Sequence, residues 1–233
     1  MKSKTILNLL ILFMLSVQTA FASRSRHEEE SVSDVEEHLL MAIQEAPVHR
    51  DILTTVFWVG ERAKPRSGWS DNLDSAWDAR WKENFGGLDS PINRKGYLPA
   101  KFRPRQNPFY VALPFNDISN PGYLDTCPLL QYFRVKKPAR IHSVCKNQWI
   151  EITHGGKTCY AQWQDVGPVY TDDYEYVFGG EAPRATNREM AGLDVSPGIR
   201  DYLKFNGTCH SDWRFVEASD VPEGPWKKVV TRN

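Results

Sequence analysis

The sequence predicts an all-β domain that is preceded by an N-terminal helix and interrupted by a long tryptophan-rich insertion. Short runs rich in β-branched and aromatic residues recur along the chain, separated by turns that contain glycine and proline. Two of these runs flank an evident hairpin turn, whereas helical periodicity is confined to short stretches. The length of 233 residues suits one domain with elaborations.

Residues 1–22 have the features of a cleaved secretory signal peptide. Lys2 and Lys4 give a positive start, residues 6–17 are apolar, and residues 20–22 supply the small-x-small pattern of a cleavage site. The apolar run is shorter than the about 20 residues that span a bilayer. We therefore expect an exported protein, periplasmic or secreted, without a stable membrane anchor.

Residues 23–50 form an acidic lead-in to the predicted strands. Ser33 and Glu36 have the spacing of a capping box. From Val35 onward, apolar residues recur every four positions along one helical face. The pattern predicts an amphipathic helix that packs on the domain, with a solvated tether as the alternative.

The β domain is expected over residues 51–218, followed by a polar tail over residues 219–233. Residues 53–59 are rich in β-branched and aromatic side chains and predict the first strand. Residues 109–115 form the next strand-like run.

The insertion covers about residues 62–108, which is too long for an ordinary loop. It predicts a short helix around residues 74–84. Its tryptophans, Trp69, Trp77 and Trp81, suit either a wall of a binding groove or a clasp over the domain. For Trp149 and Trp213, elsewhere in the chain, core packing is expected.

The clearest hairpin joins residues 149–153 to residues 158–164 through the turn at 154–157. Side chains alternate between the two faces of a strand. By this parity Asp165 shares the more apolar face of the second strand with Trp163.

Residues 193–195 alternate as in a short strand. Ser196 followed by Pro197 is an N-cap with proline at the first helical position, which predicts a helix over residues 197–203. Residues 213–216 predict the final strand.

Two aspartates are candidates for chemistry because of their positions. Asp165 follows a strand and Asp194 precedes a helix, and strand ends are where sites are commonly built. A carboxyl held against apolar walls has a raised pKa, as a general acid requires. The residues alone leave two alternatives open: Asp194 could be stabilised by the helix dipole, and Asp165 could accept backbone hydrogen bonds in a turn.

The cysteines are Cys127, Cys145, Cys159 and Cys209. In an exported protein an even number favours disulfides, here two, and four cysteines allow three pairings. Buried free thiols are the alternative. Zinc is disfavoured because no two cysteines have C-x-x-C spacing.

The chain carries 29 basic and 29 acidic residues, which argues against nucleic acid as the main partner. Its six histidines lack metal-binding spacing, so we expect neither a metal nor a cofactor. We expect a monomer.

A family resemblance adds to these patterns. Residues 164–170 (Gln-Asp-Val-Gly-Pro-Val-Tyr) and 192–197 (Gly-Leu-Asp-Val-Ser-Pro) resemble motifs of the double-psi β-barrel shared by rare lipoprotein A, bacterial expansins and family 45 endoglucanases. Residues 54–60 look like the first strand of that group, and residues 112–115 resemble a further segment of it. The resemblance implies a six-stranded double-psi β-barrel.

It also implies action on cell-wall polysaccharide, either peptidoglycan or cellulose and hemicellulose. By resemblance, Asp194 would be the essential acid and Asp165 its acidic partner. The reaction would be lytic or hydrolytic cleavage, or expansin-like loosening. The residues expected to hold the glycan are Thr55, Trp58, Trp163 and Tyr170.

The chain departs from these families at two site positions. The endoglucanases have a catalytic aspartate at the end of the first strand, where this chain has Val59, with Glu61 as the nearest substitute. Tyr110 lies near the place of a histidine in rare lipoprotein A. Catalysis is therefore left open, and a non-catalytic module that binds glycan or protein is the alternative function.

Overall fold

The computed structural model describes residues 46–63, 71–136, 142–184 and 191–232. The predicted signal peptide and almost all of the predicted lead-in helix lie outside these residues, as does Trp69. Within the described chain, six strands close into a mixed parallel and antiparallel barrel in the order β1-β7-β4-β6-β5-β8. These strands are β1 (His49–Val56), β4 (Tyr110–Leu113), β5 (Trp149–His154), β6 (Lys157–Val166), β7 (Leu193–Val195) and β8 (Cys209–Val216).

The barrel combines two parallel pairs of strands with four antiparallel ones. β1 pairs in parallel with β7, and β4 pairs in parallel with β6, whereas the other neighbours are antiparallel. Closure leaves no unpaired barrel edge. The long connections that parallel pairing requires carry the insertion and the helices.

The β5–β6 hairpin confirms the predicted one. Gly155 and Gly156 form its turn at φ of 56° and 73°, a conformation that glycine adopts without steric cost. The predicted helix after β7 is also confirmed as α5 (Pro197–Leu203). Ser196 caps α5 by accepting a hydrogen bond from the N–H of Ile199.

The barrel interior is filled by apolar side chains. The inward-pointing residues include Val111 and Leu113 of β4 and Ile150 and Ile152 of β5, all of which are completely buried. Trp149 and Trp213 are buried, as expected. Fully burying one valine, leucine or isoleucine side chain stabilises a fold by about 1.5–3 kcal/mol.

The described residues of the predicted insertion pack on the outside of the barrel. Its helix, α2 (Trp81–Phe85), begins later and is shorter than the helix predicted around residues 74–84. The preceding residues turn instead, because Asp78 accepts a hydrogen bond from the N–H of Arg80 and so competes with helical pairing. Trp81 and Phe85, one turn apart, both point to the barrel.

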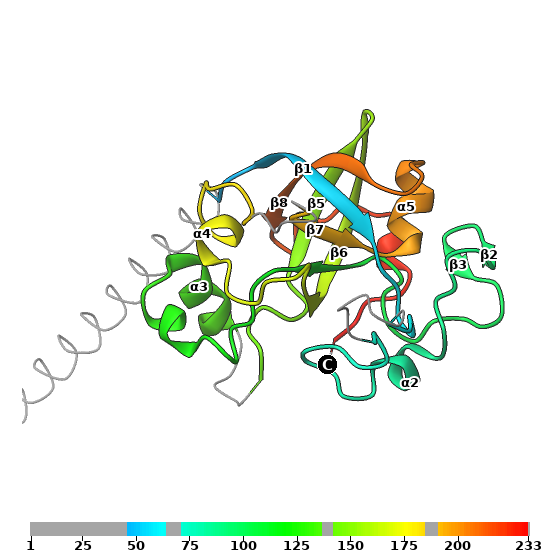
Figure 1. Cartoon of the computed structure of the whole chain (residues 1–233), viewed down its shortest axis with the longest axis horizontal. Coiled ribbons are helices and arrows are strands. Elements are labelled where there is room, and N and C mark those ends of the chain that lie inside the picture. The colour runs from blue at the N-terminus through cyan, green and yellow to red at the C-terminus, as the bar shows by residue number, and fades with distance from the viewer. Residues whose placement is uncertain (1–45, 64–70, 137–141, 185–190, 233) are drawn as a thin grey trace, which may run out of the picture. The chain divides into compact units, whose positions relative to one another are not determined.

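These two rings join an apolar cluster on the outer face of the barrel, against which Phe102 packs. The cluster consists of Phe57, Val59, Trp81, Phe85, Tyr110 and Ala112. Beyond it, β2 (Arg94–Lys95) and β3 (Leu98–Pro99) form a small sheet that projects from the same side as α5 (Figure 1).

Several short helices lie in connections for which the sequence predicted no helix. They are η1 (Pro121–Asp125), α3 (Pro128–Lys136), α4 (Tyr174–Val177) and η2 (Pro225–Lys227). Figure 1 places α3 and α4 together on the side of the barrel away from α5. In the part of the chain that is described, no helix has the length and apolar character needed to cross a membrane.

The expected C-terminal tail is instead packed against the barrel. Val221, Trp226 and Thr231 are buried. The backbone of Thr231 exchanges two hydrogen bonds with the amide side chain of Gln162, at 2.9 and 3.0 Å. Gln162 lies on β6, so the last residues belong to the folded domain.

The expected disulfides are not formed, and all four cysteines are free thiols. Cys127, Cys145 and Cys159 are buried, and Cys209 is half-buried. Burial raises the pKa of Cys159 well above its ordinary range and that of Cys209 to about 11. Both thiols are therefore held in the protonated, unreactive form at neutral pH.

Candidate functional site

Four side chains form a row across neighbouring strands of the barrel. Thr55 of β1 is opposite Asp194 of β7, Asp194 is opposite Ala112 of β4, and Ala112 is opposite Asp165 of β6. Directly opposed residues point to the same face of a sheet. Ala112 belongs to the cluster on the outer face, so the row lies outside the barrel.

A β-bulge places Asp165 in this row. The β4–β6 register pairs Val111 with Trp163 but then Ala112 with Asp165, so Gln164 is the extra residue. Without the bulge, Asp165 would point inward with Trp163, as strict alternation along β6 predicted. That prediction is wrong, because an inserted residue exchanges the two faces of the strand beyond it.

The space between the two carboxyls is lined by small residues. Two strand spacings put the Cα atoms of Asp165 and Asp194 about 10 Å apart. A Cβ atom built on Gly167 would stand 3.9 Å from Oδ2 of Asp194 and 4.0 Å from Cβ of Ala112. The Asp194 carboxyl therefore reaches toward the turn that follows Asp165.

Asp194 is oriented by a neighbour in the row. The hydroxyl of Thr55 donates a hydrogen bond to Oδ1 of Asp194. The cap of α5 is Ser196, so Asp194 is not the residue that satisfies the first N–H groups of that helix. Asp194 is half-buried on the outer face.

Asp165 is almost enclosed, with 7% of its surface exposed. Its Oδ1 accepts hydrogen bonds from the N–H groups of Ala76 and Val166, both at 2.8 Å. Asp165 therefore accepts backbone hydrogen bonds, as the alternative prediction of a turn residue had it, but only through Oδ1. Among the described residues, none donates to Oδ2.

Burial raises the pKa of Asp165 to about 7. The nearby carboxyls of Asp194 and Asp74 raise it further, while the two backbone hydrogen bonds oppose the change. A carboxyl in this state exchanges a proton near neutral pH.

Residues 75–77 of the insertion cover Asp165, and we call this segment the clasp. Besides the bond from Ala76, Trp77 lies edge-on to Trp163 at 5.4 Å between ring centroids. The indole N–H of Trp77 also donates to Asn116 at 3.1 Å. Of the two roles considered for the tryptophans, Trp77 acts as a clasp beside Asp165.

The aromatic residues expected to hold a glycan differ in accessibility. Trp163 is completely buried, and its indole N–H donates to the carbonyl of Asp165 at 2.7 Å. It therefore supports the bulge and has no surface for a ligand, which corrects its expected role. Trp58 and Tyr170 are half-buried.

Arg184, which contacts Tyr170, was not identified from the sequence. The guanidinium of Arg184 lies 4.2 Å from the centroid of the Tyr170 ring. Arg184 also pairs with Asp172 and Asp173, which fixes it in place. The residues next to Arg184 do not predict this contact, because it depends on the path of the chain between residues 170 and 184.

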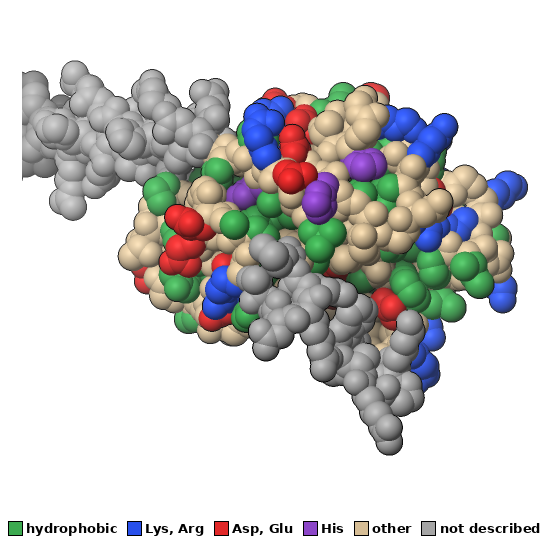
Figure 2. Space-filling model, turned by 45° about the horizontal axis from the view of Figure 1, so that its top comes forward, with side chains coloured by type: hydrophobic (Ala, Val, Ile, Leu, Met, Phe, Trp, Pro, Cys, Tyr) green, Lys and Arg blue, Asp and Glu red, His purple; other side chains and the backbone are tan. Residues whose placement is uncertain are grey.

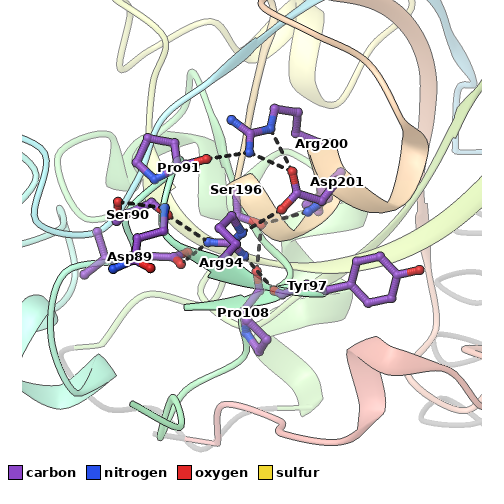
Figure 3. A network of polar contacts seen from close by, with 12 residues as sticks. Asp89, Ser90, Pro91, Arg94, Tyr97, Pro108, Ser196, Arg200 and Asp201 are labelled. Atoms are coloured by element: carbon purple, nitrogen blue, oxygen red, sulfur yellow. Dashed lines mark hydrogen bonds and ion pairs between the residues drawn. The ribbon is translucent and has the colours of Figure 1, made fainter. Parts of the chain in front are cut away.

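The two departures from the resembled families contact a separate polar network around Asp89 and Arg94, which Figure 3 shows. The Tyr110 hydroxyl donates to Asp89 at 2.9 Å and accepts from the N–H of Val59 at 3.0 Å. Asp89 is also paired with Arg94 at 2.5 Å. Tyr110 and Val59 are both completely buried, so this network holds the insertion on the barrel and is closed to a ligand.

Glu61 lies in the connection after β1. Its Oε2 accepts a hydrogen bond from the Asn72 side chain at 3.3 Å. Residue 61 therefore stabilises the start of the insertion. Two surface cavities along the described residues are lined by other parts of the chain, and neither includes Asp165 or Asp194.

Comparison with known proteins adds no assignment, since no family model and no curated protein matches the chain significantly. In the described ranges, no group of three or more histidine, cysteine, aspartate or glutamate residues is arranged to hold a metal ion.

Proposed function

We propose that this protein is exported, to the periplasm or the medium, and acts as a monomer on cell-wall polysaccharide. The proposed fold is a double-psi barrel, which the closed six-stranded arrangement permits. The observation that carries the proposal is the placement of Asp165 and Asp194 on one outer face, on either side of Ala112.

The paired carboxyls have different environments, as acid–base catalysis requires. Asp165 is nearly enclosed and holds a proton up to about pH 7, so it can protonate the oxygen of a leaving sugar. Asp194 is more accessible and hydrogen-bonded by Thr55, and by resemblance it is the essential residue. In inverting enzymes the two carboxyls are about 6.5–9.5 Å apart, which is compatible with a separation of two strands.

The proposal is tested with the purified mature protein and an Asp194→Asn control. Each is incubated with peptidoglycan sacculi and with cellulose or xylan. Soluble fragments are measured by mass spectrometry and retained protein by pull-down. Fragments from the wild type but not from the variant establish an enzyme and identify its substrate; an absence of both fragments and retention rejects the proposal.

A non-catalytic module that binds glycan or protein is the second candidate. This second candidate is favoured by the surroundings of Asp165. The clasp nearly encloses this residue, and its carboxylate already accepts two backbone hydrogen bonds. It is also favoured by Val59 at the place of the endoglucanase base. Binding that is unchanged in Asp194→Asn and occurs without fragments supports this second function.

A further inference from the structure

A separate cavity of about 680 Å³ lies along the insertion. This volume is within the range of about 300–1,000 Å³ that is usual for small-ligand sites. Its charged lining residues are four basic ones and two acidic ones. They are Arg62, Arg80, Lys82 and Arg105, and Asp74 and Glu83.

The four basic and two acidic lining residues leave the cavity with two more positive than negative charges. Arg80 and Lys82 form no ion pair with any residue in the described ranges. Arg105 donates to the backbone carbonyls of Glu83 and Asn84, which positions its guanidinium but leaves its charge in place. Arg62 is 4.0 Å from Asp71, and its side chain is 75% exposed, so screening by water weakens that pair.

The segment of chain that supplies Arg105 to the cavity is basic as well. Residues 91–108 contain five basic residues and no acidic one, although the chain as a whole is balanced. Among them Lys95, Lys101 and Arg103 are exposed. Figure 2 shows lysine and arginine side chains gathered at the end of the molecule that carries β2 and β3.

The cavity adjoins the carboxylate row through the clasp. Asp74 lines the cavity, and Ala76, two residues later, donates its N–H to Asp165. Two residues of extended chain cover at most about 7 Å. An extended polymer lying over the row can therefore reach the cavity.

We propose that this cavity binds the carboxylate groups of an acidic polysaccharide, as a subsite next to the Asp165–Asp194 row. The inference rests on the proposed function in taking polysaccharide as the ligand. Arginine matches a carboxylate with two parallel hydrogen bonds, and Lys82 adds a point charge. Phosphate-bearing polymers share this anionic chemistry, so the experiment separates the two sources.

The test compares two soluble β-1,4-glucans of equal length, carboxymethylcellulose and hydroxyethylcellulose, which differ in charge. Binding to the mature protein is measured by calorimetry, with polyphosphate as a third polymer. We expect the carboxylated polymer to bind at least about tenfold more tightly than the neutral one, as one or two charge-assisted hydrogen bonds would produce. Added salt should reduce this difference.

Arg80→Gln combined with Lys82→Gln should remove the preference. The matched control is Lys227→Gln combined with Lys228→Gln, which removes the same charge from a different cavity. Arg80→Lys with Lys82→Arg keeps the charge and should keep at least part of the preference. This last pair guards against a loss caused by misfolding.

Equal binding of the two glucans by the wild-type protein overturns the inference. An equal loss of the preference for the carboxylated glucan in the two glutamine double variants also overturns it. Polyphosphate that binds as tightly as the carboxylated glucan also overturns it. Asp194→Asn separates this inference from the proposed function, since it should abolish cleavage and keep the preference for carboxylates. A preference without cleavage of any glycan would leave the subsite standing and reject catalysis.

Discussion

Two buried titratable residues show how position changes the chemistry of a side chain. Asp165 is enclosed by the clasp and keeps one oxygen unengaged. His49 is stacked on Trp213 at 3.9 Å between ring centroids and is 5% exposed. The Nε2 of His49 is buried with no hydrogen-bond partner among the described residues. Each residue links the stability of the fold to pH, in opposite directions.

Asp165→Asn should stabilise the protein at alkaline pH. The pKa of Asp165 rises from an ordinary value of about 3.9 to about 7, so the folded state disfavours its ionised form. Its favourable contribution is complete below about pH 4 and is lost as the pH rises through 7, which amounts to at most about 4 kcal/mol. Asparagine can still accept both backbone hydrogen bonds.

Urea unfolding of both proteins at pH 4.5 and pH 8 measures this effect. The advantage of the variant in free energy of unfolding should grow by about 2–4 kcal/mol between the two conditions. A variant that is less stable by the same amount at both pH values would contradict the raised pKa.

His49→Phe should protect the protein against acid. Burial lowers the pKa of His49 to about 4, so the folded state holds the neutral ring. The associated stability is complete above about pH 6.5 and is lost as the pH falls through 4, by at most about 3 kcal/mol. Thermal unfolding from pH 7.5 to 4.5 should show a smaller decrease in Tm for the variant; parallel curves would argue against this role.

At the scale of the elements, a buried ion pair holds the insertion in place. Arg94 joins Asp89 at 2.5 Å to Asp201 of α5 at 2.6 Å, and so ties the insertion to the helix (Figure 3). Asp89 is completely buried. Burial raises the pKa of Asp89, and the Arg94 charge opposes this change.

Arg94→Ala should destabilise the fold by about 3–5 kcal/mol, because it leaves the Asp89 charge buried without its partner. Arg134→Ala is a matched control, since it breaks the exposed pair with Asp125 at 3.0 Å and should cost at most about 1 kcal/mol. Urea unfolding measures both changes. Limited proteolysis should cut the insertion first in Arg94→Ala, and equal effects of the two substitutions would refute the proposed tie.

At the scale of the whole molecule, the C-terminal residues pack against the closed barrel. Thr231 bonds Gln162 of β6, and its hydroxyl accepts the N–H of Asn107 at 2.9 Å. Trp226 packs edge-on to Phe109 at 5.9 Å between ring centroids. The final segment therefore contacts β6, the residue that precedes β4 and the end of the insertion.

Removal of residues 219–233 should lower stability by several kcal/mol. It exposes the surface that Trp226 covers, and truncating a buried tryptophan alone costs about 3–5 kcal/mol. The Tm of the truncated protein, compared with that of a Trp226→Ala variant, measures the loss. An unchanged Tm would support the tail expected from sequence.

Several elements followed from sequence because their causes are local. The β5–β6 hairpin needed only Gly155 and Gly156 between two alternating runs, and α5 needed only Ser196 and Pro197. Asp165 and Asp194 could be singled out by their places at strand ends. For these features the deciding interactions lie within a few neighbouring residues, so a short stretch of sequence contains them.

The composition of the site, by contrast, was decided by the tertiary structure. The bulge at Gln164 puts Asp165 on the outer face, the clasp from Ala76 encloses it, and Arg184 covers Tyr170. The burial of Trp163 and the free thiols were likewise not readable from spacing. Each depends on the strand register and on contacts between residues far apart in the chain, and only closure of the barrel sets them.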